Sequence, residues 1–265
     1  MRKVAELLDL TGRVALVTGG AGHIGLAICE ALAENGCALA VLDRDAAASS
    51  WQQVASRFDV RTRYFEVDLE DELATRLAVA DVVQDFGRLD ILVNNAAFVA
   101  SNDLTGWATA FAKQDVHTWR RALEVNLTAA LVLCQAAAPA LAVSGHGSIV
   151  NLASIYGVLG PDWRLYDGTS MGNPAAYATS KGGLIQLSRW LATTLAPHVR
   201  VNSISPGGVA RGQPQEFIAR YEARTPLGRM ACEEDLKGIV ALLASDASAY
   251  ITGQDILVDG GWSAW

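Results

Sequence analysis

The chain has 265 residues and a mass of 28.1 kDa, with 51% apolar and 18% charged positions. This length is enough for one globular domain with a substantial core, and we expect a single domain spanning residues 1–265. The formal net charge of −7 offers no basic surface for nucleic acid or for an anionic membrane. We therefore expect neither nucleic acid nor a membrane among its partners.

The cysteines and the N-terminal residues give no sign of secretion or of a metal site. Four cysteines are scattered through the chain without a C-x-x-C pair or matching histidine spacing. The basic start of the chain leads into Glu6 and Asp9 without the apolar stretch of a signal peptide. The longest apolar run, 129–143, is shorter than the roughly 20 residues that span a bilayer. We expect a cytoplasmic protein with free thiols and no metal.

Short apolar runs alternate with helical patterns along the chain. We predict strands at 14–18, 38–42, 62–67, 89–93, 148–152, 199–204 and 256–258. Helical spacing is found from Ile24, from Ala46 and over 70–86, 129–143 and 184–195. Strands that are apolar on both faces require a parallel sheet covered on both sides. The sequence therefore predicts an α/β fold, a doubly wound parallel sheet of about seven strands with helices on both faces.

Two stretches, 98–114 and 155–174, have little regular pattern. Each follows a predicted strand, and long loops inside a compact domain are more often functional than idle. In an open α/β sheet such loops border the ligand crevice at the carboxyl ends of the strands. We expect both stretches to lie near a binding site.

A glycine cluster follows the first strand. Gly20, Gly22 and Gly25 satisfy G-x-G-x-x-G and precede a helical pattern, which is the arrangement of a pyrophosphate-binding Rossmann turn. A tight turn that binds nothing could carry the same glycines. Asp43 ends the second strand 18 residues after Gly25, near the spacing of a carboxylate that binds the adenosine ribose. It favours NAD over NADP, although Arg44 could soften repulsion of a 2′-phosphate and a solvated turn is the alternative.

Tyr177 and Lys181 are four residues apart in a helical stretch and so project from one face. A phenol with its ordinary pKa of about 10 needs a nearby cation to act as an acid or base at neutral pH. The pair is suggestive of proton transfer, but a Y-x-x-x-K pattern also arises by chance.

The chain resembles the short-chain dehydrogenase/reductase family, single-domain branch, from Thr18 to Gly261. The motifs that carry the resemblance are Thr18 to Gly25, Asp68-Leu69, Asn94-Asn95-Ala96-Ala97, Asn126, Ser154, Tyr177 with Lys181, and Pro206-Gly207. The resemblance implies an NAD(P)-dependent enzyme that interconverts a secondary alcohol and a ketone, and a homo-oligomer, a tetramer by expectation. The uniformly apolar helices at 129–143 and 184–195 also favour an oligomer.

The resemblance implies roles for individual residues. Tyr177 would exchange a proton with the substrate oxygen, Ser154 would bind the same oxygen, and Lys181 would lower the phenol pKa and hold the nicotinamide ribose. Asn126 would hold a water that links Lys181 to solvent, the alternative being a hydrogen bond within its helix. The cofactor-binding residues would be Gly19, Gly22, His23, Ile24, Gly25, Asp43, Arg44, Asp68, Leu69, Asn94, Asn95, Ala96, Tyr177, Lys181, Pro206, Gly207 and Val209.

Three departures from the family pattern bear on function. The inner glycine at Gly22, with His23 in the usual glycine position, matches the extended branch of nucleotide-sugar epimerases and dehydratases. Ser154 and Tyr177 are 23 positions apart, about ten more than is usual, so a segment is inserted beside the site. Arg211 replaces the threonine expected after Pro206-Gly207 and could bind a carboxylate or phosphate.

The inserted segment is expected to govern substrate choice, with Trp163, Arg164 and Tyr166 orienting a hydroxylated or anionic molecule. A surface flap or a subunit contact is the alternative. A narrower similarity to sugar-modifying reductases of nonulosonic acid pathways favours a sugar, a polyol or a derivative as substrate. The competing hypotheses are a nucleotide-sugar epimerase or dehydratase and a non-catalytic dinucleotide-sensing protein.

Overall fold

A computed structural model of the chain describes residues 1–44, 50–98 and 104–265. Seven parallel strands form one sheet in the order β3-β2-β1-β4-β5-β6-β7. Their bounds are β1 Val14–Thr18, β2 Ala38–Asp43, β3 Thr62–Glu66, β4 Ile91–Asn94, β5 Gly147–Leu152, β6 Val199–Pro206 and β7 Asp255–Val258. Strand order reverses between β1 and β4, which is where an open sheet opens a ligand crevice. The predicted α/β fold is confirmed.

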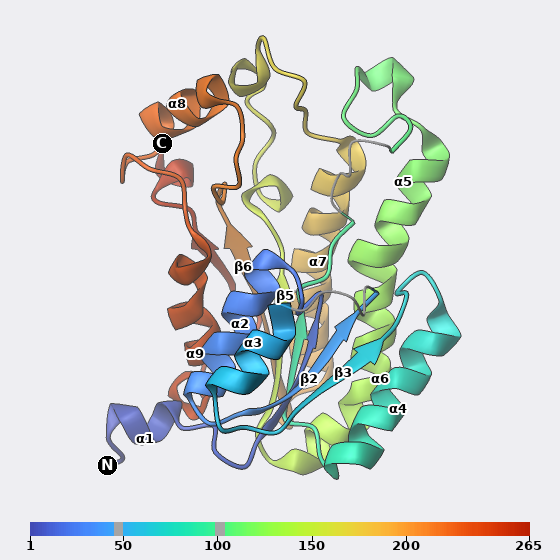
Figure 1. Cartoon of the computed structure of the whole chain (residues 1–265), viewed down its shortest axis with the longest axis vertical. Coiled ribbons are helices and arrows are strands. Elements are labelled where there is room, and N and C mark those ends of the chain that lie inside the picture. The colour runs from blue at the N-terminus through green and yellow to red at the C-terminus, as the bar shows by residue number, and fades with distance from the viewer. Residues whose placement is uncertain (45–49, 99–103) are drawn as a thin grey trace.

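Helices cover both faces of the sheet (Figure 1). They are α1 Val4–Leu8, α2 His23–Glu34, α3 Ser50–Arg57, α4 Glu72–Phe86, α5 Val116–Leu123, α6 Ala129–Ser144, α7 Ala175–Thr194, α8 Gln215–Arg224 and α9 Lys237–Ala244. Alternate residues of β1 separate the two cores: Ala15 and Val17 pack with α2, α3 and α9, whereas Val14 and Leu16 pack with α4, α6 and α7. The sheet is therefore doubly wound, as the apolar strands predicted.

The predicted bounds of the strands are within two residues of the observed ones, and two differences illustrate the local detail. β4 starts at Ile91 rather than Leu89, and the preceding Asp90 is fully buried, its carboxylate accepting from the Val14 amide and the Arg88 guanidinium. α4 starts at Glu72 because Asp71 caps it by accepting from the Ala74 amide. The predicted start of a helix at Ala46 lies outside the described residues.

α5, a π-helical turn at Glu124–Thr128 and α6 form a continuous helix, 116–144, long and apolar enough by length and composition to cross a membrane. Buried core helices pass the same test, and Leu133, Ala137 and Leu141 are indeed buried in the core under the sheet. Much of its remaining apolar surface is only partly covered within one chain.

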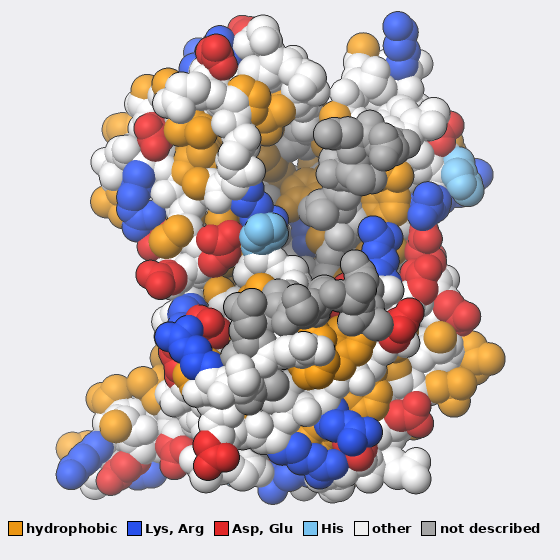
Figure 2. All heavy atoms as spheres, in the orientation of Figure 1, with side chains coloured by type: hydrophobic (Ala, Val, Ile, Leu, Met, Phe, Trp, Pro, Cys, Tyr) orange, Lys and Arg blue, Asp and Glu red, His pale blue; other side chains and the backbone are white. Residues whose placement is uncertain are grey.

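The described parts of both irregular stretches lie at the carboxyl edge of the sheet, as predicted. The first carries a 3₁₀ turn at Phe111–Lys113, and its residues 99–103 lie outside the described part. The second contains 3₁₀ turns at Ile155–Gly157 and Trp163–Tyr166 and packs against α8. Figure 2 shows the face of the molecule hollowed between the part that carries α8 and the part that carries α5.

Candidate active site

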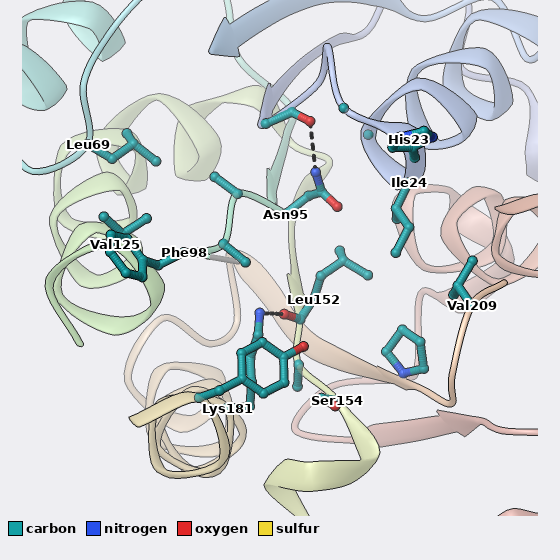
Figure 3. Close-up of a pocket in the computed structure, with 18 of the residues that line it drawn as sticks. His23, Ile24, Leu69, Asn95, Phe98, Val125, Leu152, Ser154, Lys181 and Val209 are labelled. Atoms are coloured by element: carbon teal, nitrogen blue, oxygen red, sulfur yellow. Dashed lines mark hydrogen bonds between the residues drawn. The ribbon is translucent and has the colours of Figure 1, made fainter. Parts of the chain in front are cut away.

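A cavity of about 710 Å³ opens at the carboxyl ends of β1, β4, β5 and β6. Most residues predicted for catalysis or cofactor binding line it: Gly19, Gly22, His23, Ile24, Gly25, Asp43, Arg44, Asp68, Leu69, Asn95, Ala96, Ser154, Tyr177, Lys181, Pro206, Gly207 and Val209. Figure 3 shows His23 and Ile24 across the cavity from Lys181 and Ser154. Asn94 and Asn126 do not line it.

The glycine-rich turn is shaped by close backbone contacts. A Cβ atom on Gly25 would lie 2.0 Å from the Gly19 carbonyl oxygen, and one on Gly19 would lie 2.9 Å from the Ala96 Cα. Gly19 also has a φ of +63°, which a residue with a side chain rarely adopts. A Cβ on Gly22 would meet its nearest atom at 3.4 Å, an ordinary contact. Gly19 and Gly25 are therefore sterically required, whereas Gly22 is not.

This turn leads into α2, whose first residues His23 and Ile24 line the cavity. The free amides of a 12-residue helix bind anions at its N-terminus. The backbone of this turn thus fits the pyrophosphate of a dinucleotide. Within the described ranges no three His, Cys, Asp or Glu side chains gather closely enough to hold a metal ion.

Asp43 stands at the end of β2 and faces the same cavity. Its Oδ2 accepts from the Ala21 amide at 3.1 Å and its Oδ1 from the Arg44 amide at 2.8 Å. Each carboxylate oxygen can accept further hydrogen bonds, so the pair of backbone donors aims the carboxylate and leaves capacity for ribose hydroxyls. Asp68 is similarly oriented, since its Oδ1 accepts from the Glu70 amide at 3.0 Å.

The side chains of the neighbouring residues Asn94 and Asn95 point in different directions and have different partners. Asn95 donates through Nδ2 to the carbonyl oxygens of Thr18 and Gly19, at 3.0 Å each, and fixes the end of β1 (Figure 3). Asn94 instead points into the protein and donates to Asn151 Oδ1 at 2.8 Å. The side chain of Asn94 therefore does not reach the cavity, and support of the cofactor by the backbone near Asn94 to Ala96 stays a prediction.

Ser154, in the loop just after β5, and Tyr177 of α7 lie close to one another. Burial raises the pKa of Tyr177, while a hydrogen bond with the Ser154 hydroxyl and the charge of Arg211 act to lower it. Burial prevails, so the phenol is protonated at neutral pH. Lys181 is not among the groups that shift this pKa, so the stabilisation of the phenolate by Lys181 stays a prediction.

Lys181 is almost fully buried on the next turn of α7. Its Nζ lies 5.8 Å from the centroid of the Tyr177 ring and donates to the Leu152 carbonyl oxygen at 2.6 Å (Figure 3). Burial lowers the pKa of Lys181 to about 8. The one-face geometry of the pair is as predicted, and the ammonium is held at the bottom of the cavity.

Asn126 lies in the π-helical turn between α5 and α6. Its Oδ1 accepts from the Phe98 amide at 2.5 Å, and its Nδ2 donates to Ser180 Oγ at 3.0 Å. Ser180 in turn donates to the Tyr177 carbonyl oxygen at 2.8 Å. The alternative of a hydrogen bond within its own helix is therefore wrong, since Asn126 connects the loop after β4 with α7.

The inserted segment reaches the cavity through Ile155 and Tyr156 rather than through Trp163, Arg164 or Tyr166. Tyr156 lines the cavity, whereas Trp163 is 57% exposed and Arg164 pairs with Asp162 at the surface. Further lining residues that sequence patterns did not single out are Phe98, Leu104, Arg121 and Val125. Arg121 forms an ion pair with Glu70, with Nε 2.7 Å from Oε1. Charged residues on helices usually face solvent, so no pattern in the sequence indicated that Arg121 lies in the cavity.

Arg211 lines the mouth of the cavity. Its Nε lies 3.7 Å from Glu233 Oε1, and His23 Nδ1 lies 3.9 Å from the same oxygen. The Glu233 carboxylate therefore lies between His23, after the turn that follows β1, and Arg211, in the loop after β6.

Residues 19–263 match a protein-family model described as enoyl-(acyl carrier protein) reductase. A probable galactose dehydrogenase of Rhizobium meliloti is 36% identical over 266 residues, which cover 97% of each chain. A cis-4-hydroxycyclohexanecarboxylate dehydrogenase of Sinomonas cyclohexanicum is 32% identical, covering 95% of this chain and 97% of that protein.

Solved structures agree over the same length. A short-chain type dehydrogenase/reductase from Mycobacterium marinum superposes with a TM-score of 0.87 at 31% identity, covering 100% of both chains. An NAD⁺-bound xylitol dehydrogenase gives 0.84 at 32% identity, covering 95% of this chain and 99% of that one. A putative gluconate 5-dehydrogenase from Beutenbergia cavernae with bound NADP gives 0.85 at 33% identity, covering 98% and 100%.

Proposed function

Because the chain belongs to the short-chain dehydrogenase/reductase family, and is thereby an NAD(P)-dependent dehydrogenase acting on CH–OH groups, we propose that it interconverts a secondary alcohol and a ketone on a sugar, a polyol or a derivative, with NAD preferred. The observation that carries the proposal is the meeting of Ser154, Tyr177 and Lys181 in one cavity with the glycine-rich turn.

When bound, the nicotinamide would supply or accept the hydride. In the direction of ketone reduction, the Tyr177 phenol donates its proton to the substrate oxygen, to which the Ser154 hydroxyl also donates. The nearby Lys181 ammonium stabilises the phenolate that remains. In the direction of alcohol oxidation, the phenolate takes the proton back. Asn126 positions α7 through Ser180, and a water beside it would connect Lys181 with solvent.

Asp43 supports the preference for NAD. A 2′-phosphate would meet its carboxylate and displace the ribose hydroxyls that it is oriented to bind. The similar structures include both an NAD⁺-bound and an NADP-bound enzyme, so the preference is tested by the ratio of kcat/KM for the two cofactors.

The names of the relatives support a hydroxylated substrate, since they include galactose, xylitol and a hydroxycyclohexanecarboxylate. The experiment is a screen of sugars, polyols, sugar acids and a nonulosonic acid with each cofactor, following NADH at 340 nm. Net NADH formation from an alcohol supports the proposal. Turnover of a nucleotide sugar without net NADH would support the epimerase or dehydratase hypothesis, and cofactor binding without any turnover would support a sensing protein.

We also propose a soluble, cytoplasmic homotetramer. The partly covered apolar surface of α6, together with Trp190, 57% exposed on α7, would be buried between subunits rather than in a bilayer. Light scattering at micromolar concentration tests this, and a monomer would contradict it.

A further inference from the structure

Arg211 brings a positive charge to the wall of the cavity. It lies in the loop after β6, at the position where the family pattern has an uncharged threonine. About a third of its side chain, 35%, is exposed, so a molecule that enters the cavity can reach it. Val209, two residues earlier, borders the same cavity (Figure 3). A bound substrate therefore lies within reach of a guanidinium group.

The hydrogen-bond donors of this guanidinium group are not used by the protein. Its acidic neighbour is Glu233, but the distance from Nε to Oε1 is 3.7 Å, longer than a hydrogen bond. The Arg211 side chain forms no hydrogen bond with any residue that the structure describes. Arg121, which lines the same cavity, instead donates to both carboxylate oxygens of Glu70, at 2.7 and 3.0 Å. Arg211 therefore keeps its donors available for a ligand.

The backbone that carries Arg211 is fixed in position. The Arg211 amide donates to Gln213 Oε1 at 2.6 Å, and Gln213 Nε2 donates to the Val209 carbonyl oxygen at 2.8 Å. The Ala210 amide donates to the Ala231 carbonyl oxygen at 2.9 Å, which joins the loop to the segment before Glu233. A ligand has to order only the arginine side chain and not the loop, which lowers the entropic cost of binding.

The charge of Arg211 acts on the side of the cavity where the reaction would take place. It is close enough to Tyr177 to lower the pKa of the phenol, against the effect of burial. In the other direction, Glu233 lies between Arg211 and His23, the first residue of α2. A carboxylate thus separates the guanidinium group from the turn that fits the pyrophosphate. An anion bound by Arg211 is therefore favoured near Tyr177.

We propose that Arg211 binds a carboxylate group of the substrate and makes the enzyme selective for hydroxy acids, such as sugar acids, over neutral sugars and polyols. This inference rests on the proposed function and deepens it. A planar guanidinium group matches a carboxylate through two parallel hydrogen bonds. A carboxylate is favoured over a doubly charged phosphate because Glu233 already places one negative charge beside the guanidinium group.

The test compares probes of nearly equal shape that differ in charge: D-gluconate and D-mannonate, each with its uncharged amide, and with NAD as cofactor. The wild type should have the higher kcat/KM for the acid of at least one pair. In Arg211→Met, the acid-to-amide ratio of kcat/KM should fall at least about tenfold, the value of one charge-assisted hydrogen bond. A change in the acidity of Tyr177 would affect the acid and the amide alike and so cancels in this ratio.

Arg63→Met is the matched control and should keep the wild-type ratio. Arg63, in β3, also has its Nε 3.7 Å from an acidic side chain, that of Asp85, but it does not line the cavity. Arg211→Lys keeps the charge without the planar pair of donors, so it should retain part of the preference for the acid. Thermal unfolding and NADH titration check each variant, and Arg211→Gln takes the place of the methionine variant if that one does not fold.

The results separate this inference from the proposed function. If the wild type oxidises neutral sugars or polyols but oxidises the acids no better than their amides, the inference is overturned while the proposed function stands. The same holds if folded Arg211→Met keeps the wild-type ratio. Weaker NADH binding together with an unchanged ratio would also overturn it and would assign Arg211 to the pyrophosphate of the cofactor. If the wild type oxidises none of these probes and no sugar or polyol, the proposed function fails as well.

Discussion

The turn after β1 and the segment 155–174 border the same cavity, yet backbone atoms shape the first and side chains shape the second. In the turn, Gly19 and Gly25 are required because no Cβ would fit. In the segment, the side chain of Tyr156 lines the cavity, and Tyr166 supports it through the contact between the two hydroxyls. A surface made of backbone recognises what every dinucleotide shares, whereas a surface made of side chains can change with the substrate. We therefore expect the first region to bind the cofactor and the second to govern substrate choice.

The largest effect is expected at Tyr177, which lines the cavity that both regions border. Tyr177→Phe keeps the ring and removes the proton, so kcat should fall by about 10² to 10⁴ while NADH binding survives. NADH fluorescence titration and steady-state kinetics measure the two quantities. A variant that retains nearly wild-type kcat would show that Tyr177 is not the acid.

The pH dependence of stability at Lys181 tests whether water is excluded from its ammonium group at the bottom of the cavity. Its pKa of about 8 in the folded chain lies below its ordinary value of 10.5, so between these pH values the unfolded chain binds more protons. Stability should therefore rise with pH across this window, by at most about 3 kcal/mol relative to Lys181→Met.

Urea denaturation of both proteins from pH 7.5 to 10.5 measures that difference, and the other titrating groups cancel in it. Parallel curves for the wild type and Lys181→Met would mean that the ammonium is hydrated. The boundary between the two regions would then be wetter than the structure indicates.

Gly25→Ala tests whether the turn after β1 has no room for a side chain. Its Cβ would lie 2.0 Å from the Gly19 carbonyl oxygen, so the turn must shift and stability should fall by about 1–3 kcal/mol or more, with weaker NADH binding. Gly22→Ala is the matched control, because its Cβ finds an ordinary contact at 3.4 Å. Equal losses in the two variants would contradict the steric account.

Asp43→Asn addresses cofactor choice with the smallest expected effect. Removing the charge should lower the NAD-to-NADP ratio of kcat/KM by about tenfold, the value of one charge-assisted hydrogen bond. Asp81→Asn, an exposed residue of α4, changes the net charge equally and should leave the ratio as it is. An unchanged ratio in Asp43→Asn would move the preference to other residues, with Arg44 the first to test.

Patterns that depend on local spacing were predictable from the sequence. Short strand patterns located all seven strands, six of them apolar runs and β3 a mixed one, and the i, i+4 spacing placed Tyr177 and Lys181 on one face. The direction of single side chains at strand ends and in loops was not, because tertiary packing decides it. Asn94 thus points inward to Asn151, and Trp163 points to solvent while Tyr156 reaches the cavity. Asn126 was singled out through the family resemblance, but its partners Phe98 and Ser180 come from distant segments.

The attachment of the inserted segment to α8 has a consequence for how such enzymes can be recombined. Arg220 and Arg224 hold the segment from one side, and on the other Tyr221 of the same helix accepts from the Gly208 amide at 2.6 Å, in the loop that borders the cofactor side of the cavity. If the segment alone were replaced, two guanidinium groups and one aromatic ring of α8 would lose their partners. The segment and α8 should therefore be exchanged together. A chimera that receives both would also keep the contact between α8 and the loop after β6.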